Sequence, residues 1–390
     1  MSSSANVPPW CDGEVERLAW NIGSTIGATH ADEVDRDARF PAETVRALTE
    51  GCLMSAMVPS DLGGQGASMR SIATATRALA HHCSASALVF AMHQMQVACL
   101  TEHGTTEPLR DLLRSVATEG TLIGNANSEV GIGGSTGQSL CAISHNGGRV
   151  QLHKDVLAIS YGLKADALLI TARRHADAAA SNQVLLALRP GSFTLEQTSG
   201  WNTIGLRGTC SAGFLVHADE SDDMLFPDGW ATIVEQTGGP ATEILLNSVW
   251  LGIAEAAAHR AHRFVRADAR RNIGTTPMNA PLLAEVAVTL GSVRSLMSSF
   301  LDRFDAATGT EEIHSAATIL ALRNLKLSTT TLAIEIVTKA SMICGFAGYH
   351  RDSDFSMDRS LRDVFGGPLM ANNARFMNQN AHLLLAMRDM

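Results

Sequence analysis

The sequence lacks any cluster of basic residues. Lysine and arginine total 30 against 39 aspartate and glutamate, which gives a formal charge of -9. The arginine pairs at Arg173 and Arg270 are short and isolated. Because phosphate backbones are bound by clustered lysines and arginines, the composition argues against a nucleic-acid partner.

Cysteine is present without the spacing that would give it a structural role. The seven cysteines are odd in number, scattered, and include no C-x-x-C pair. This excludes the usual zinc and redox motifs and gives no metal site. Free thiols are typical of a reducing compartment. The seven are Cys11, Cys52, Cys83, Cys99, Cys141, Cys210 and Cys344.

No targeting signal is evident either. The first residues, MSSSANVPPWCDGE, have neither a basic start nor an apolar segment, so no signal peptide is predicted. We find no apolar run that would be long enough to span a bilayer. The expected location is therefore the cytoplasm, with no membrane partner.

What the chain does have is the material of a large globular protein, with 390 residues of which 45% are hydrophobic. Residues 1–120 have helical periodicity, including an apolar stretch at 72–100. Residues 121–227 change to short β-like segments separated by turns such as HNGG and RPGS. Residues 228–390 return to helices. We predict three domains with these boundaries.

Particular segments carry this prediction. The expected strands are TLIGNANS, SLCAIS, RVQLH, ALLITAR, QVLLALR and GFLVH, arranged as a small antiparallel barrel or sandwich. A second long C-terminal helix is expected at about 315–343. The first has one apolar face, formed by Leu282, Val286, Leu290, Val293, Met297, Phe300 and Phe304.

The most informative run is WNTIGLRGTCS, from Trp201 to Ser211. Its glycines allow tight backbone turns, Arg207 is a fixed cation, and Thr209 and Ser211 offer hydroxyls. The run resembles the W-x-x-x-G-x-R-x-T-x-S signature of the acyl-CoA dehydrogenase superfamily, a set of flavoenzymes. The resemblance implies that Arg207, Thr209 and Ser211 lie at the flavin.

Four further segments resemble the same superfamily in the same order. They are VPSDLGGQGAS (58–68), ARRNIG (269–274), CGFAGY (344–349) and RSLRD (359–363). In relatives the arginine matched by Arg270 reaches the FAD diphosphate of a neighbouring subunit. The glycines matched by Gly345 and Gly348 approach the ADP half of FAD, which favours FAD over FMN.

The resemblance covers nearly the whole chain and implies a fold. That fold is α+β: an N-terminal α domain, a middle antiparallel β-barrel and a C-terminal four-helix bundle. If Arg270 and the Gly345–Gly348 loop complete a neighbour's site, the protein is a homo-oligomer, either a dimer or a homotetramer.

The departures from the dehydrogenases concern the catalytic base. Relatives place a glutamate after the R-D element, but no Asp or Glu occurs here between Asp363 and Asp389. A second branch supplies the base from the first bundle helix, at a position that matches Thr242. Glu243 is adjacent, but a shift of one residue rotates a helix by about 100°. Glu243 is therefore the alternative base.

The start of the middle domain also departs. GNANSEVGIGG is similar to the flavin-dependent monooxygenases built on this fold, such as the dibenzothiophene monooxygenase type. Those enzymes receive reduced flavin from a separate reductase and form a C4a-hydroperoxide with O2. The resemblance assigns flavin-edge roles to His93, Asn127 and Ser160, and a flavin contact to Ser128. Two C-terminal histidines of that group are absent, with Val364 and Gly367 nearby instead.

Each of these residues also has a structural interpretation. A lone histidine such as His93 on an apolar helix is more often a buried residue with satisfied hydrogen bonds. Asn127 and Ser160 could bond ordinary backbone at strand ends.

The leading hypothesis is an FAD-dependent oxygenase that acts on an organic substrate, which could be a CoA or carrier-protein thioester. The alternative is an acyl-CoA dehydrogenase that performs α,β-desaturation with Glu243 as base. A third is a non-catalytic scaffold of the same fold.

Overall fold

The computed structural model describes residues 7–387. Residues 1–6, which begin the segment examined above for a signal peptide, lie outside the described part of the chain, as do residues 388–390.

The N-terminal region is helical. Its central helix, α5, is buried along almost all of its length, which explains why it is apolar on every side. Ser68 caps α4 by accepting a hydrogen bond from the amide of Ser71 at 3.2 Å. The helices are α1 (Glu14–Ile22), α2 (Ala28–Arg36), α3 (Ala42–Glu50), α4 (Met69–Ala80), α5 (Ser84–His103) and α6 (Glu107–Thr118), with a π-helical turn, η1 (Gly23–Gly27), between α1 and α2.

The middle region consists of two four-stranded sheets. The first has the order β1-β4-β5-β8 and the second β2-β3-β7-β6. β4 and β5 are buried because they lie inside the first sheet, and they read as continuous apolar runs. The strands are β1 (Ile123–Ala126), β2 (Ser144–Asn146), β3 (Arg149–Val156), β4 (Ala167–Arg173), β5 (Gln183–Leu188), β6 (Phe193–Ser199), β7 (Gly213–Ser221) and β8 (Leu225–Gly229).

The middle region is a β domain, as predicted, and it differs in two ways from the antiparallel barrel, one of the two arrangements expected for it. β1 pairs with β4 in parallel, with Ile123 opposite Ala167, and no strand pairing joins the two sheets in the described chain. The segment SLCAIS is not a strand, since it contributes only an isolated bridge at Ala142 before β2 begins at Ser144. β6 and β8 have weaker apolar patterns and were missed.

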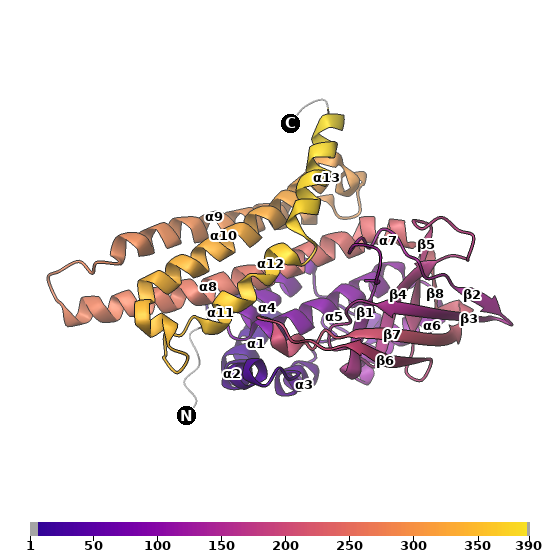
Figure 1. The fold of residues 1–390 in the computed structure, drawn as a ribbon, viewed down its shortest axis with the longest axis horizontal. Helices are drawn as coiled ribbons and strands as arrows, with labels where there is room; N and C mark the ends of the chain where they lie inside the picture. Colours follow the sequence, from indigo (N-terminus) through magenta and orange to yellow (C-terminus); the bar gives the residue numbers. More distant parts are fainter. Residues whose placement is uncertain (1–6, 388–390) are drawn as a thin grey trace.

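The C-terminal region is built on three long helices, which lie alongside one another and form the elongated arm in Figure 1. The predicted face of α9 is correct, because Val286, Val293 and Phe300 are all buried. α10 contains a kink at Gly345, whose φ of 54° suits glycine. The elements are α7 (Trp230–Ile233), a π-helical turn η6 (Val234–Gly238), α8 (Gly239–Arg271), α9 (Ala280–Ala307), a 3-10 turn η7 (Glu311–His314), α10 (Ala316–Tyr349), α11 (Asp358–Val364), α12 (Gly366–Leu369) and α13 (Asn373–Ala386).

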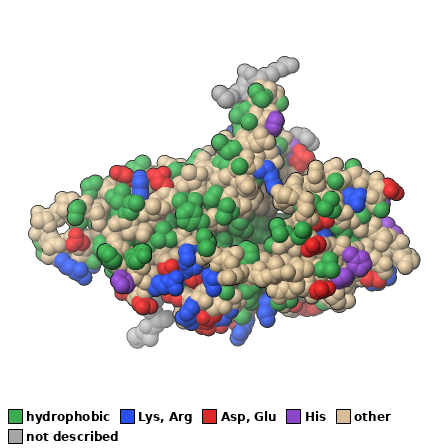
Figure 2. Space-filling view, viewed as in Figure 1, with side chains coloured by type: hydrophobic (Ala, Val, Ile, Leu, Met, Phe, Trp, Pro, Cys, Tyr) green, Lys and Arg blue, Asp and Glu red, His purple; other side chains and the backbone are tan. Residues whose placement is uncertain are grey.

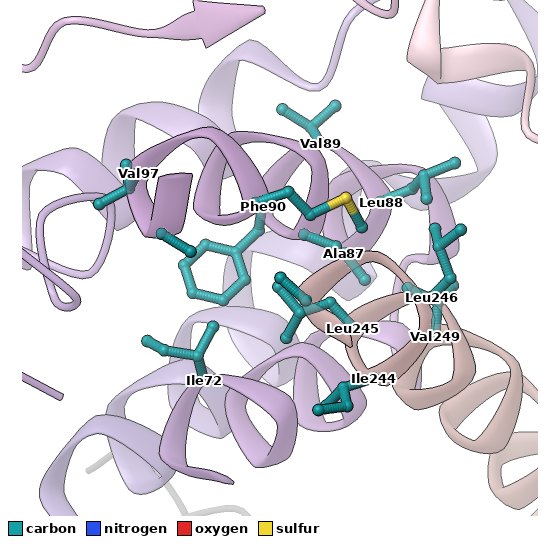
Figure 3. Packing of buried hydrophobic residues seen from close by; sticks show 14 of the residues in the cluster. Ile72, Ala87, Leu88, Val89, Phe90, Val97, Ile244, Leu245, Leu246 and Val249 are labelled. Carbon is teal, nitrogen blue, oxygen red and sulfur yellow. The ribbon is translucent and has the colours of Figure 1, made fainter. Parts of the chain in front are cut away.

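The first long helix of the bundle, α8, joins the C-terminal region to the N-terminal one. Leu245 and Leu246 of α8 pack against α5, near Leu88 and Phe90, in the cluster drawn in Figure 3. Gly252 permits a close approach to α4, because a Cβ there would lie 2.5 Å from the carbonyl oxygen of Arg77. This packing brings the start of α8 against the N-terminal and middle regions.

Two bundle helices bear on the sequence prediction that no apolar run is long enough to span a bilayer. α9 and α10 are long and apolar enough to cross a membrane by length and composition, each with a mean hydropathy of 1.3 in its most apolar window. Only 22% of that window in α9 and 39% in α10 is buried. Figure 2 shows hydrophobic side chains along this arm. The exposed ones include Val288, Leu296, Met342 and Phe346.

Candidate active site

A large cavity of about 1120 Å³ lies where the bundle meets the middle region, and the surface is hollowed there in Figure 2. Its walls are mostly apolar and come from all three regions. α5 contributes Met92 and Met95, α9 contributes Phe300 and Phe304, and Trp230 lies at the start of α7. A cavity of this size, with few polar groups in apolar walls, is typical of a small-molecule site.

One wall of the cavity carries a chain of hydroxyl groups. Ser160 Oγ lies 2.9 Å from Ser211 Oγ, which lies 2.9 Å from Thr209 Oγ1. Thr209 in turn donates to the carbonyl oxygen of Leu206 at 2.9 Å. All four residues line the cavity. The segments that carry them are held together by backbone bonds from Ile159 and Tyr161 to the Trp201–Ser211 run and the residue that follows it.

The turn that presents these hydroxyls has an unusual backbone. Leu206 and Cys210, on either side of the short helical turn η4 (Arg207–Thr209), both have left-handed conformations, with φ of 54° and 47°. Such conformations are costly for residues other than glycine and persist only where the surroundings enforce them. At Leu206 this conformation is held by Asp363, whose Oδ1 accepts a hydrogen bond from the Leu206 amide at 2.6 Å.

Gly205 has to be glycine for a related reason. A Cβ at this position would lie 2.4 Å from the carbonyl oxygen of Arg362. The Trp201–Ser211 run is thus pressed against α11, and another matched segment, RSLRD, holds it in place.

Asn127 follows β1 and lines the cavity beside Ser128. Its Oδ1 is buried and has no hydrogen-bond partner among the described residues. Ser128 Oγ is already engaged, since it donates to the carbonyl oxygen of Ala158 at 3.0 Å. An unpartnered buried amide oxygen is costly and indicates a ligand that donates to it.

A flavin ring fits these groups. Its edge offers carbonyl oxygens and an N–H, which match the amide of Asn127 and the hydroxyls of Ser160 and Ser211. The predicted residues Asn127, Ser128, Ser160, Thr209 and Ser211 all line one cavity, so the structure brings them together as the sequence implied.

His93 lies elsewhere. It is fully buried on α5 and does not line the cavity. Its Nε2 lies 3.0 Å from the carbonyl oxygen of Met54, and its Nδ1 accepts from the Ile123 amide at 3.1 Å. Burial lowers the pKa of His93 to about 4, so the ring is neutral. Both ring nitrogens contact backbone groups, which supports a structural role, and the flavin-edge role of His93 stays a prediction.

Arg207 contacts backbone groups of this chain, and its predicted contact with the flavin stays a prediction. Its Nε donates to the carbonyl oxygen of Asp35 at 2.8 Å and its Nη1 to that of Thr203 at 3.1 Å. Arg207 therefore ties the end of α2 to the Trp201–Ser211 run, and it does not line the cavity.

Arg270, Gly345 and Gly348 do not line this chain's cavity. Arg270 is exposed near the end of α8 and forms no hydrogen bond or ion pair within residues 7–387. Gly348 packs tightly, since a Cβ there would lie 2.8 Å from Cys344 Cβ. The predicted contact of Arg270 with the flavin of a neighbouring subunit stays a prediction.

Glu243, predicted as the alternative base, does line the cavity, next to Thr242. It is only 4% exposed, and its Oε2 has no hydrogen-bond partner in the described structure. Burial raises the pKa of Glu243 to about 7, although the Lys326 charge acts in the opposite direction. Lys326 donates to the carbonyl oxygen of Ala371 at 2.9 Å and to Asn373.

Sequence reasoning missed several cavity residues. Arg323 on α10 and Arg375 on α13 are cations of the wall, and Gln96 receives a hydrogen bond from Asn125 at 3.2 Å. The run that contains Asn125, GNANSE, was recognised, but nothing in the local sequence indicated the two arginines.

Comparison with known proteins agrees with this geometry. The acyl-CoA dehydrogenase N-terminal domain matches residues 24–120, and the acyl-CoA dehydrogenase C-terminal domain matches residues 228–369. Together they cover more than half of the chain. The chain belongs to the acyl-CoA dehydrogenase superfamily and is a flavin-dependent oxidoreductase.

Similar proteins come from both branches of the superfamily. A probable FMNH2-dependent monooxygenase of Pseudomonas putida is 23% identical, over 93% of this chain and 92% of its own. A probable acyl-CoA dehydrogenase of Mycobacterium bovis is also 23% identical, over 86% and 85%. The crystal structure of an FMN-bound dibenzothiophene monooxygenase from Paenibacillus sp. A11-2 superimposes with a TM-score of 0.85 at 19% identity, covering 97% and 98% of the two chains. That structural likeness establishes the fold.

Proposed function

We propose that this protein is an oxygenase that uses reduced flavin and O2 to oxygenate an organic substrate bound in the cavity. The observation that carries the proposal is the pairing of an unpartnered amide at Asn127 with the Ser160–Ser211 hydroxyls in an otherwise apolar cavity. Reduced flavin supplies the oxygen activation when bound. The protein residues would position the flavin and exclude water, which limits side reactions in the site.

The wall after Asp363 supports the same proposal. The residues of this segment that line the cavity include Gly366, Leu369, Met370 and Ala371, and none is a carboxylate. The usual dehydrogenase base is therefore missing from its place. Similarity to a monooxygenase named for its use of FMNH2 also supports a separate reductase as the source of reduced flavin.

A dehydrogenase with an unusual base is the second candidate, and one observation favours it. Glu243 is a buried, unpartnered carboxyl in the cavity wall, with a pKa raised to about 7 by burial. A carboxylate with a pKa near the working pH is a good general base. Under this alternative the protein desaturates an acyl-CoA.

Anaerobic turnover separates the two candidates. The flavin-loaded protein is mixed with a panel of acyl-CoA thioesters and an artificial electron acceptor in the absence of oxygen. The oxygenase proposal predicts no reduction of the acceptor with any thioester. Acceptor reduction that is lost in Glu243→Gln, with folding intact, would establish the dehydrogenase instead.

We propose FAD as the flavin only in the context of an oligomer. Within one chain, the predicted cofactor residues that line the cavity have groups suited to the flavin ring, which FMN and FAD share. The residues that favoured FAD lie outside the cavity wall, so they require a second copy. Fluorescence titration tests this, because Arg270→Ala should weaken FAD binding and leave FMN binding unchanged.

We propose a dimer or tetramer for a second reason. The exposed apolar side chains of α9 and α10, such as Val288 and Phe346, form a face that self-association would cover. All seven cysteines are free thiols, which supports the proposed reducing, cytoplasmic location.

A further inference from the structure

The cavity contains a cation that has no partner within the described part of the chain. Arg323 lies on α10, half-buried, and lines the cavity beside Ile319 and Leu322. Among residues 7–387 it forms neither a hydrogen bond nor an ion pair. Its neighbours Ile319 and Leu322 are apolar, so among the described residues they offer the partly buried guanidinium no hydrogen bond.

The other arginines of the wall show what a compensated cation looks like. Arg362 forms ion pairs with Asp35 at 2.5 Å and Asp358 at 2.7 Å. Arg375 donates to the carbonyl oxygen of Gly133 at 3.2 Å. Arg362 is therefore structural, and Arg375 is partly engaged. Arg323 differs from both because its donors are free to meet a ligand.

The acidic groups of the cavity do not neutralise Arg323. Glu235 is exposed and lies near His314, at 4.0 Å. Glu243 is buried and faces the charge of Lys326. Neither carboxylate forms an ion pair with Arg323, which would require an approach of 4.0 Å or less to its guanidinium.

Burial lowers the pKa of Arg323, but an arginine remains charged at any physiological pH. A half-buried charge without a partner destabilises the free protein. An oxyanion removes that cost, and it also matches the planar fork of guanidinium donors, which binds carboxylate and phosphate through two parallel bonds.

We propose that Arg323 binds an anionic group of the substrate, a carboxylate or a phosphate, while the apolar wall holds the rest of the molecule. The inference rests on the proposed function, in that the cavity is taken as the substrate site. It narrows the substrate class from any organic molecule to an amphipathic anion.

Three matched probes test the proposal. Indole-3-acetate, indole-3-acetamide and 3-indoxyl phosphate share an aromatic body that suits walls lined by Phe300, Phe304 and Trp230. Isothermal titration of the purified protein measures their affinities without reductant or turnover. We expect at least one anion to bind about tenfold tighter than the neutral amide, the worth of a charge-assisted hydrogen bond. Which anion binds tighter identifies the group.

The variants locate the effect. Arg323→Met should reduce anion affinity about tenfold, to the level of the amide, and Arg323→Lys should retain part of the preference. Arg303→Met is the control, because Arg303 is exposed on α9, outside the cavity, and donates only to the carbonyl oxygen of Ala317. It should leave all three affinities unchanged. Thermal unfolding confirms that each variant is folded.

Three results would overturn the proposal: equal affinity of the wild type for anions and amide, an anion preference that survives in Arg323→Met, or no anion binding at any soluble concentration. None of them depends on flavin or oxygen. Failure of the oxygenase proposal would appear instead in the reaction of the reduced flavin, so the two failures are distinguishable.

Discussion

Asn127 and His93 show how the surroundings decide the role of a single side chain. Both were matched to the flavin edge by resemblance. Both ring nitrogens of His93 form hydrogen bonds with backbone groups, namely the Met54 carbonyl and the Ile123 amide. Asn127 keeps a buried oxygen without a partner in the described chain, and it faces the cavity. Only Asn127 has a bond left to offer a ligand.

This contrast predicts opposite effects of two substitutions. His93→Ala should destabilise the fold by at least about 2 kcal/mol, because it removes two buried hydrogen bonds and leaves a void. Asn127→Ala should weaken flavin binding with little change in stability. Thermal unfolding and fluorescence titration with FMN measure the two effects. A His93 variant with wild-type stability and impaired flavin binding would restore the original prediction for this residue.

Glu243 gives stability a pH dependence. Its pKa is raised from 4.5 to about 7 in the folded state, so the folded protein holds a proton that the unfolded chain has released. Stability contributed by this group is therefore present below pH 4.5 and is lost as the pH rises toward 7.

Glu243→Gln removes that loss. Relative to wild type, the variant should gain stability between about pH 5 and pH 7, by up to roughly 3 kcal/mol for a shift of this size. Lys326, whose pKa burial lowers to about 8, interacts with Glu243, because the charge of each group favours the charged form of the other. Melting temperatures of the two proteins across pH provide the measurement. A difference that does not change with pH would show that Glu243 is ionised throughout.

At the scale of elements, the cavity wall depends on α11. Asp363, near the end of α11, accepts from the Leu206 amide and from the hydroxyl of Ser84, and so holds the strained η4 turn. Asp363 is fully buried and is not itself part of the cavity wall. The RSLRD segment thus acts on the flavin site through the Trp201–Ser211 run.

Asp363→Ala should therefore reduce flavin affinity, by about tenfold if one charge-assisted hydrogen bond to the turn is lost. Flavin fluorescence titration measures the change. Asp358→Ala is the matched control, since Asp358 pairs with Arg362 on the same helix without contacting η4. Equal effects of both variants would indicate a general loosening of α11 rather than a specific support of the turn.

At the scale of the whole molecule, the arm formed by α9 and α10 exposes large apolar side chains that the rest of the described chain does not cover. Val288 is 72% and Phe346 82% exposed. Self-association would bury these side chains.

Val288→Glu with Phe346→Glu should shift the protein to a smaller species in sedimentation velocity, because two buried charges oppose association. Leu163→Glu is the control: Leu163 is similarly exposed, at 67%, but lies in the middle region. A wild type that sediments as a monomer would contradict the proposed oligomer.

The reach of the sequence can be judged from individual residues. Order and spacing of the motifs led to Asn127, Ser160, Thr209 and Ser211, which all line one cavity, and their contact with a flavin stays a prediction. Arg207 matched its motif, but its guanidinium donates to the backbone carbonyls of Asp35 and Thr203. A sequence motif does not reveal such contacts.

Two further features depend on contacts that are distant in sequence. Arg323 was not predicted, because the absence of an ion partner is a property of the folded cavity. The uncertainty over Glu243 arose because adjacent helix positions differ by about 100° in direction, so sequence alone did not show whether Glu243 reaches the site. Thr242 and Glu243 both reach the cavity.

The most direct test of the oxygenase proposal follows the flavin itself. The protein is loaded with flavin, reduced anaerobically and mixed with oxygenated buffer in a stopped-flow spectrometer, while peroxide is assayed in parallel. The account predicts a delayed return of the oxidised flavin spectrum with little early peroxide, and loss of that delay in Asn127→Ala. Immediate reoxidation of the wild type with stoichiometric peroxide would contradict it.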